Sequence, residues 1–157
     1  MSEYCATVNW VRGDNEDYID NQYSRGHLWI FDGGLTVPAS SSPYVVPVPY
    51  SVEENIDPEE AFVASLSSCH MLFFLSIAAN NKYIVDEYID NAIGVLEKDS
   101  SGKISMTKVF LRPKVIFSKD AQPTVEEIET MHHQSHEQCF IANSVKTEIV
   151  IDLSPDK

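Results

Sequence analysis

The three cysteines, Cys5, Cys69 and Cys139, are the residues of this sequence best suited to covalent chemistry. A thiolate is a strong nucleophile, but a buried cysteine is more often an inert, small hydrophobic residue. Cys69 lies deep inside one predicted helix and Cys139 near the end of another. If those helices pack together, the two thiols could reach the Cα separation of about 4.4–6.8 Å that a disulfide needs. The residues alone leave open whether the two form a redox pair or are inert, whereas Cys5 is best explained as a packed residue of a strand.

The histidines suggest a second kind of site. His132, His136 and Cys139 fall at i, i+4 and i+7 on one helix face, and His70 follows Cys69 directly. Imidazole and thiolate groups are the ligands that zinc prefers. The same spacing is common among solvent-facing histidines, and His133 must point away from its neighbour His132. We therefore expect no metal site and keep zinc binding as the competing hypothesis.

A thiolate in a buried site needs a cation beside it, and the candidates are few. Arg12, Arg25 and Arg112 are the only arginines of the sequence. Arg25 precedes an aromatic hairpin, Arg12 follows the first predicted strand, and Arg112 precedes a proline. In a chain with 24 acidic residues, each of them could equally form a surface ion pair.

The element that must position Cys69 is a long helix predicted over residues 57–80. Asp57 can cap it, Pro58 suits the first helical position, and Glu60 completes a D-x-x-E capping box. From Ala61 onward the apolar residues leave no polar face, so the helix must be buried on nearly all sides. Four polar residues interrupt its centre and no Lys/Arg cluster flanks it, which favours a core helix over a membrane span. These four residues are Ser65, Ser67, Ser68 and His70.

The remaining patterns predict an α+β fold in a single domain, residues 1–157. Strands are expected at Tyr4–Val11 (half-buried), His27–Phe31, Leu35–Ala39, Asn91–Glu97, Lys103–Leu111, Lys114–Phe117 and Val145–Leu153. Residues 40–55 are expected to form an extended loop, and Thr124 and Glu127 predict a capping box that opens a second helix. One sheet and one amphipathic helix cover only part of the long helix, so a homodimer is expected to supply the rest.

Composition excludes several classes of function. The net charge of −13 disfavours nucleic-acid binding, which needs a basic surface. The N-terminus has no basic segment followed by an apolar one, so no secretory signal is expected. Three widely spaced cysteines do not suggest an extracellular disulfide framework. We therefore expect a cytoplasmic protein that has neither nucleic-acid nor membrane partners.

Three segments of the sequence resemble motifs of one known family. DPEEAFVASLSSCHM, at residues 57–71, resembles the first cysteine motif of the OsmC/Ohr family, the osmotically inducible protein C and organic hydroperoxide resistance proteins. HEQCFIANSV, at residues 136–145, resembles the second cysteine motif. YSRGHLWIFDGG, at residues 23–34, is similar to the hairpin that carries the family's catalytic arginine. The two cysteine motifs occur in the order and spacing typical of the family, and the expected order of strands and helices matches the family over nearly the whole chain.

The resemblance implies an OsmC-like fold, with two antiparallel β-sheet regions wrapped around long central helices in an intertwined homodimer. It also implies a thiol peroxidase that reduces organic hydroperoxides to alcohols without a cofactor. Cys69 would be the peroxidatic thiolate and Cys139 the resolving thiol. Arg25 would be the partner of the thiolate, and Glu59 would hold Arg25 by a bidentate ion pair. An external thiol or dithiol would reduce the Cys69–Cys139 disulfide.

Two features of the sequence depart from the family pattern. Residues 54–57 replace the glycine-rich segment that precedes the first cysteine motif in the hydroperoxide-resistance branch, and His70 follows Cys69 directly. The competing functions are therefore a zinc-binding or other metal-binding protein, and a small-ligand-binding protein of the same fold that has no peroxidase turnover.

Overall fold

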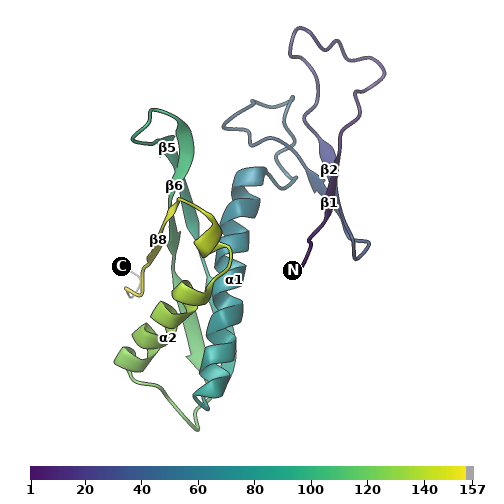
Figure 1. Ribbon diagram of the computed structural model, residues 1–157. Helices are drawn as coiled ribbons and strands as arrows, with labels where there is room; N and C mark the ends of the chain where they lie inside the picture. Colours follow the sequence, from purple (N-terminus) through teal and green to yellow (C-terminus); the bar gives the residue numbers. More distant parts are fainter. Residues whose placement is uncertain (155–157) are drawn as a thin grey trace. The chain divides into compact units, whose positions relative to one another are not determined.

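A computed structural model describes residues 1–154. The chain forms two compact units, one comprising Met1–Ala61 and the other beginning at Phe62, and each is described by itself. Figure 1 shows the elements of both units and labels most of them.

The first unit contains a three-stranded antiparallel sheet with β2 (His27–Phe31) between β1 (Ala6–Asn9) and β3 (Thr36–Ala39). The β2–β3 hairpin predicted from the sequence is confirmed, and its register pairs Trp29 with Val37. Gly34 has a φ of 88°, a conformation that glycine adopts without steric cost, so its place in the tight turn has a direct physical reason.

The loop between β3 and the long helix is held against the end of the sheet. The backbone N–H of Ser40 donates to the carbonyl of Ile56 at 2.9 Å, and the Ser40 hydroxyl accepts from the N–H of Val52 at 2.9 Å. Ser40 itself is completely buried. The predicted extended loop is therefore ordered by its own hydrogen bonds, and it fixes where the helix begins.

Helix α1 (Pro58–Asn80) confirms the long helix predicted from the sequence. Its capping box is present, since the Glu60 N–H donates to Asp57 Oδ1 at 2.7 Å and the Asp57 N–H donates to Glu60 Oε2 at 3.1 Å. By length and composition α1 could also cross a membrane. However, its Ser67 hydroxyl donates to Asp90 and its His70 ring is hydrogen-bonded to His132, which are contacts of a helix packed within a protein.

The second unit combines most of α1 with two small sheets and a second helix. Strand β4 (Val85–Asp90) pairs antiparallel with β7 (Pro113–Phe117). The other sheet has the order β5 (Ile93–Lys98), β6 (Ile104–Leu111), β8 (Glu148–Ile151), in which β8 runs parallel to β6. Helix α2 (Val125–Gln138) begins with the predicted Thr124–Glu127 capping box and lies beside α1 (Figure 1). A short 3-10 helix, η1 (Ala142–Ser144), follows it.

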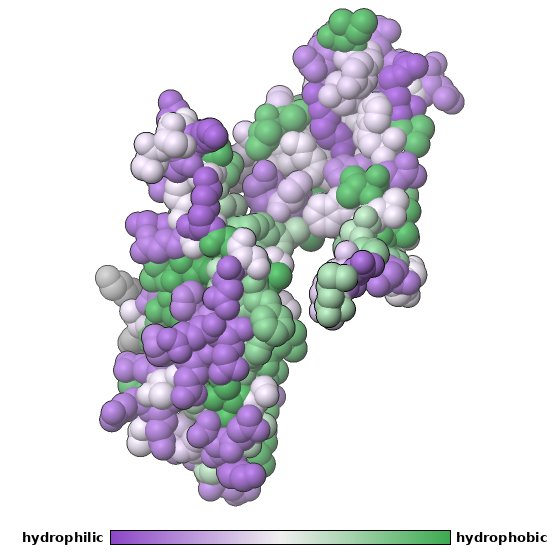
Figure 2. All heavy atoms as spheres, in the orientation of Figure 1, coloured by the Kyte–Doolittle hydropathy of each residue, from purple (hydrophilic) through white to green (hydrophobic). Residues whose placement is uncertain are grey.

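Two apolar clusters hold the second unit together. Around one end of α1, Phe74 and Ile77 pack with Phe117 of β7 and Met131 of α2. Nearer the start of α1, Leu66 packs with two buried residues of β6, Val109 and Leu111. Many apolar side chains nevertheless remain on the surface, including Leu72 of α1 at 61% exposure. Figure 2 shows hydrophobic residues along the edge of this unit that α1 forms.

The structure differs from the sequence-based expectations in three strands. The first strand covers only Ala6–Asn9 and is fully exposed rather than half-buried, because no element of its own unit covers it. Strand β4 was not predicted, because the three acidic residues in VDEYID hide its alternation. The last strand is shorter than predicted, and its parallel pairing with β6 is an exception to the expected antiparallel arrangement.

Candidate active site

The two cysteines of the predicted redox pair meet in the second unit. Cys69 projects from α1 and is partly exposed, whereas Cys139 ends α2 and is 1% exposed. Burial, followed by a hydrogen bond to the Cys69 side chain, raises the pKa of the Cys139 thiol to about 11. Cys139 therefore stays protonated at neutral pH, and Cys69 is the sulfur that a solute can reach.

The end of α2 shapes the surroundings of Cys139. Its N–H donates to the carbonyl of His136 at 3.3 Å, and its extended backbone conformation then terminates the helix. The backbone N–H of Ala142 donates to the Cys139 sulfur at 3.4 Å. Beside the thiols, Phe140 packs edge-on against Phe73 of α1, with ring centroids 5.1 Å apart. The sulfur is thus held in place by helix termination, one hydrogen bond and aromatic packing nearby.

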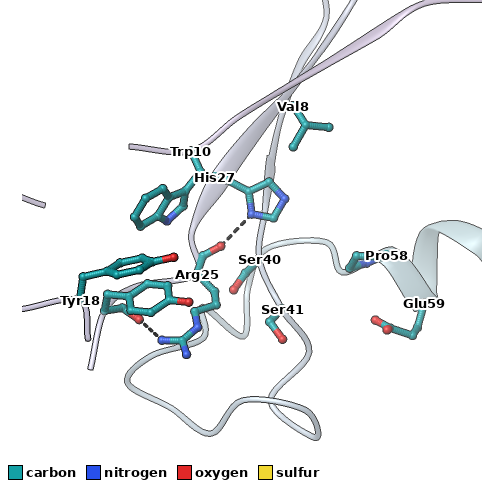
Figure 3. Close-up of a pocket in the computed structure, with 10 residues that line it drawn as sticks. Val8, Trp10, Tyr18, Arg25, His27, Ser40, Ser41, Pro58 and Glu59 are labelled. Atoms are coloured by element: carbon teal, nitrogen blue, oxygen red, sulfur yellow. Dashed lines mark hydrogen bonds between the residues drawn. The ribbon is translucent and has the colours of Figure 1, made fainter. Parts of the chain in front are cut away.

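Arg25 and Glu59 line one pocket of about 440 Å³ in the first unit (Figure 3). Most of the pocket wall is apolar or aromatic, which suits an organic group, and Arg25 and Glu59 are its two side chains with a full charge. The other lining residues are Val8, Trp10, Tyr18, Tyr23, His27, Ser40, Ser41 and Pro58.

The Arg25 guanidinium is held by the loop that precedes β2. Its Nη1 donates to the carbonyl of Asn21 at 2.8 Å and also to the carbonyl of Tyr23. The guanidinium carbon lies 3.7 Å from the centre of the Tyr23 ring, and Tyr23 stacks on Tyr18 with centroids 4.6 Å apart. Asn21 has a φ of 62°, a left-handed conformation that asparagine tolerates better than most residues. The charge is therefore fixed by main-chain dipoles and a cation–π contact.

The backbone of Arg25 is fixed as well. Its N–H donates to the carbonyl of Tyr50 at 2.8 Å, and its carbonyl lies 2.7 Å from His27 Nδ1. Trp29 Nε1 donates to His27 Nε2 at 3.0 Å, so Nε2 is an acceptor and Nδ1 carries the proton that the Arg25 carbonyl accepts. His27 and Trp29 thus orient the peptide from which the guanidinium projects.

Glu59 does not hold Arg25 in the way that the resemblance implies. Within residues 1–154 no ion pair joins the two side chains, and Figure 3 shows them on different walls of the pocket. The hydrogen bonds of the guanidinium run instead from Nη1 to the carbonyls of Asn21 and Tyr23. Glu59 remains a pocket carboxylate in the first turn of α1.

The other two arginines have different partners. The Arg12 side chain donates to the carbonyl of Glu16 in an exposed loop, and Arg112 lies 3.6 Å from Asp152. Neither of them lines the pocket that contains Arg25.

Two of the histidines form a buried pair. His70 Nε2 of α1 lies 2.9 Å from His132 Nδ1 of α2, and each residue is 1% exposed. Burial, followed by the charge of His136, lowers the pKa of His70 to about 4. Burial, followed by the charge of His70, lowers the pKa of His132 to about 3. Both rings are therefore neutral at physiological pH.

The zinc set considered from the sequence is not assembled as a ligand cluster. One nitrogen of each ring, His70 Nε2 and His132 Nδ1, is engaged with the other ring, and in the described part of the chain no three His, Cys, Asp or Glu side chains are arranged to hold a metal ion. His133 points to solvent and pairs with Glu137 at 3.3 Å.

The sequence identified some residues of these sites and missed others. It singled out the cysteines, Arg25, Glu59 and the histidines, although not the His70–His132 contact. It missed the aromatic wall of the pocket and the role of His27. The only available signal for that wall was the concentration of Trp and Tyr residues in the segment before Arg25.

Comparisons with known proteins agree with this fold. The model of the OsmC-like protein family matches residues 52–154. A solved OsmC-like protein of unknown function from Vibrio cholerae is 62% identical, with a TM-score of 0.96 over 97% of this chain and 99% of that one. No curated protein sequence gives a significant match.

More distant solved structures share the fold. An organic hydroperoxide resistance protein from Elizabethkingia anophelis has 17% identity and a TM-score of 0.69, with 96% of this chain and 93% of that one covered. The organic hydroperoxide resistance protein OhrB of Bacillus subtilis has 17% identity and a TM-score of 0.66, with 96% and 98% covered. The family model and the Vibrio cholerae relative carry the assignment: the chain belongs to the OsmC-like protein family.

Proposed function

We propose that this protein is a thiol-dependent peroxidase that reduces organic hydroperoxides, with hydrogen peroxide as a further substrate to test. The observation that carries the proposal is the contact between an accessible thiol, Cys69, and a buried thiol, Cys139, on two different helices. A peroxidatic cysteine must be reachable by its substrate, and a resolving cysteine must be close enough to trap the oxidised product. The different burial of the two sulfurs suits this division of labour.

The catalytic cycle has three chemical steps. The Cys69 thiolate attacks one oxygen of the peroxide, the O–O bond breaks, and the other oxygen leaves with a proton as the alcohol. Cys69 is then a sulfenic acid. The sulfur of Cys139 attacks the Cys69 sulfur, and the sulfenic oxygen leaves as water with the Cys139 proton. An external thiol or dithiol then reduces the disulfide by exchange, and a reducing cytoplasm would supply it.

We assign Arg25 to the stabilisation of the Cys69 thiolate and of the departing peroxide oxygen, as the family resemblance implies. A guanidinium suits this role because it is always charged and offers a planar set of donors. Its fixed position in an aromatic pocket supports the assignment, because the apolar wall can accept the organic group of a hydroperoxide. Glu59 is assigned a secondary role, as a carboxylate whose negative charge adjusts the electrostatic potential in the pocket.

We further propose that the working form is a homodimer. Of the 23 residues of α1 only five are buried within one chain, although the helix is apolar on all sides. A second chain would cover this surface.

The proposal predicts that one equivalent of tert-butyl hydroperoxide converts Cys69 and Cys139 into an intramolecular disulfide. Mass spectrometry of the digested protein should show a Cys69–Cys139 cross-linked peptide and an unmodified Cys5. With a dithiol reductant present, catalytic amounts of protein should consume the peroxide. The matched controls are Cys69→Ser, which should abolish turnover, and Cys5→Ser, which should not change it.

Two outcomes would contradict this function. A dominant cross-link through Cys5 would refute the pairing. Thiols that survive excess hydroperoxide unchanged would favour the alternative, a ligand-binding protein of the same fold without turnover.

A further inference from the structure

A pair of polar side chains is embedded in the apolar contact between α1 and α2. His70 and His132 are each 1% exposed, and their hydrogen-bonded nitrogens are 2.9 Å apart. The two rings are nearly parallel, at 8°, and Phe74 stacks on His132 with centroids 4.2 Å apart. Removing two imidazoles from water is unfavourable unless they are hydrogen-bonded. The hydrogen bond between the rings therefore offsets part of their desolvation cost.

The pair joins the two helices that carry the reactive sulfurs. His70 is the residue after Cys69 in α1, and His132 lies about two turns before Cys139 in α2. The surrounding contacts between these helices, such as that of Phe74 with Met131, are apolar and non-directional. A hydrogen bond between two rings has both a preferred length and a preferred angle. Apart from the contact of the two thiols themselves, the histidine pair is therefore the directional contact that limits how far α2 can shift along α1.

The register of the helices matters most after Cys69 has been oxidised. The attack of Cys139 on the sulfenic acid requires the sulfurs to approach to bonding distance, about 2.05 Å, with Cα atoms about 4.4–6.8 Å apart. A sulfenic acid that is not captured can react with a second peroxide and become sulfinic acid, which a thiol does not reverse. The rise of an α-helix is about 1.5 Å per residue. A shift of α2 by even a fraction of that rise would change the balance between disulfide formation and over-oxidation of Cys69.

We propose that His70 and His132 are positioning residues for disulfide formation, and that their hydrogen bond holds Cys139 where it captures the Cys69 sulfenic acid before a second peroxide does. This inference rests on the proposed peroxidase function. It adds to that function the contact that protects Cys69 from over-oxidation to sulfinic acid. In the step concerned, the S–O bond of Cys69 breaks, the S–S bond forms, and the Cys139 proton leaves with the oxygen as water.

The geometry points to positioning rather than to proton transfer. The outer nitrogens, His70 Nδ1 and His132 Nε2, have no hydrogen-bond partner among the described residues. No chain of hydrogen bonds among those residues therefore runs from the pair to either sulfur. Two further titratable residues face the pair: His136 of α2, whose charge comes second to burial in lowering the pKa of His70, and Tyr88 of β4, whose ring centroid lies 6.5 Å from that of His132. His136 Nδ1 and Tyr88 OH are also buried without a partner among the described residues.

The test compares His132→Phe with His133→Phe in a Cys5→Ser background. The first variant keeps an aromatic ring against Phe74 but removes the hydrogen bond. The second makes the same substitution on the neighbouring, solvent-facing residue. Each protein is treated with excess tert-butyl hydroperoxide, and mass spectrometry follows the loss of Cys69 thiol and the ratio of disulfide to Cys69 sulfinic acid.

The two variants should differ in the fate of the sulfenic acid and not in its formation. For His132→Phe we expect the initial loss of thiol to stay within about twofold of wild type. The ratio of disulfide to sulfinic acid should fall by about tenfold or more, which corresponds to about 1.4 kcal/mol. His133→Phe should match wild type on both measures.

Two double variants separate positioning from stability. His70→Gln/His132→Asn places carboxamide groups close to the two hydrogen-bonded nitrogens, so it should restore much of the ratio. His70→Leu/His132→Phe removes both polar groups, so the apolar contact should fold well while the ratio stays low. If the ratio follows the melting temperature across the variants, or if His132→Phe keeps the wild-type ratio, the inference is overturned. If wild type itself fails to oxidise Cys69, the proposed function fails first and this inference falls with it.

Discussion

The Arg25 side chain illustrates how a charge can be oriented without a carboxylate partner. Its guanidinium rests on the Tyr23 ring and donates to main-chain carbonyls, and Tyr18 stacks on Tyr23 in turn. A contact with carbonyl dipoles leaves the full positive charge available, whereas an ion pair would neutralise much of it. Arg25 is thus a rigid cation that keeps its capacity to stabilise an anion.

Replacement of Arg25 by Ala should therefore raise the pH midpoint of Cys69 alkylation and slow the oxidation of Cys69 by roughly tenfold or more. A rise of one pH unit in that midpoint corresponds to a loss of about 1.4 kcal/mol of thiolate stabilisation. Arg25→Lys should recover part of the rate, since an ammonium lacks the planar set of donors. Glu59→Gln should have a smaller effect than Arg25→Ala, because main-chain groups already hold the guanidinium.

The measurement is iodoacetamide labelling as a function of pH in a Cys5→Ser/Cys139→Ser background. Arg12→Ala is the matched control, since Arg12 bonds within an exposed loop. A midpoint that moves with Arg12→Ala and stays constant with Arg25→Ala would transfer the role to Arg12.

The pairing of α1 with α2 depends on two neutral histidines, which makes it sensitive to acid. The pKa of His70 is lowered to about 4 and that of His132 to about 3, both chiefly by burial, whereas an unfolded histidine titrates near a pKa of about 6.5. Between these values the unfolded chain binds more protons than the folded one. The contribution of the pair to stability is therefore complete above pH about 6.5 and is lost as the pH falls toward 4 and below.

The free energy of unfolding should consequently decrease between pH 6.5 and 4 by an amount on the order of 3 kcal/mol for one histidine, before any coupling within the pair is counted. Urea unfolding at a series of pH values measures this change. The His70→Leu/His132→Phe variant retains the carboxylates but lacks both imidazoles, so its profile should be flatter over the same interval. A variant profile that parallels that of wild type would show that other groups cause the acid sensitivity.

At the scale of the whole chain, too little apolar surface is buried for either unit to be complete on its own. Ala39 is the one fully buried hydrophobic residue among the described residues of Met1–Ala61, and β1 is exposed along its length. The α1 helix leaves Leu72 and other apolar residues on the surface, and monomeric proteins rarely expose large apolar patches. A symmetric dimer is the commonest way in which such surfaces are covered.

We therefore expect light scattering to give a mass twice the 17.7 kDa of the chain at micromolar concentration, and thermal unfolding to depend on protein concentration. Leu72→Glu, on the exposed apolar side of α1, should shift the protein toward monomers and lower its melting temperature. Val125→Glu places the same charge on an exposed aliphatic residue in the first turn of α2, where a carboxylate is favourable, and should leave the dimer intact. A folded monomer of wild type would refute the expectation.

The parts of the fold predicted from the sequence are those that local chemistry determines. The capping boxes at Asp57 and Thr124 and the glycine turn before β3 mark boundaries through contacts within a few residues. The parallel pairing of β8 with β6 joins segments that are distant in the chain, which no local pattern encodes. For the same reason the sequence drew attention to His70 and His132 but could not predict their hydrogen bond.

In the candidate site, too, the residue identities were predictable from the sequence and their contacts were not. The resemblance assigned Cys69, Cys139, Arg25 and Glu59, and the structure places the first two together in one unit and the last two in one pocket of the other. The way in which Arg25 is held was not predictable. It depends on the positive φ of Asn21 and on carbonyl groups, which every residue has and which therefore leave no signal in the sequence.

The hydrogen bond from the Ala142 amide to the Cys139 sulfur also gives the protein a built-in spectroscopic probe. A thiol sulfur and a disulfide sulfur differ in electron density and in position, so the amide proton of Ala142 should resonate at different chemical shifts in the reduced and oxidised protein. Because Ala142 opens the short helix η1, the change should extend to the amides of Asn143 and Ser144. A ¹⁵N-labelled sample observed by NMR during peroxide addition would then report the redox state of a buried sulfur in real time, without any chemical label.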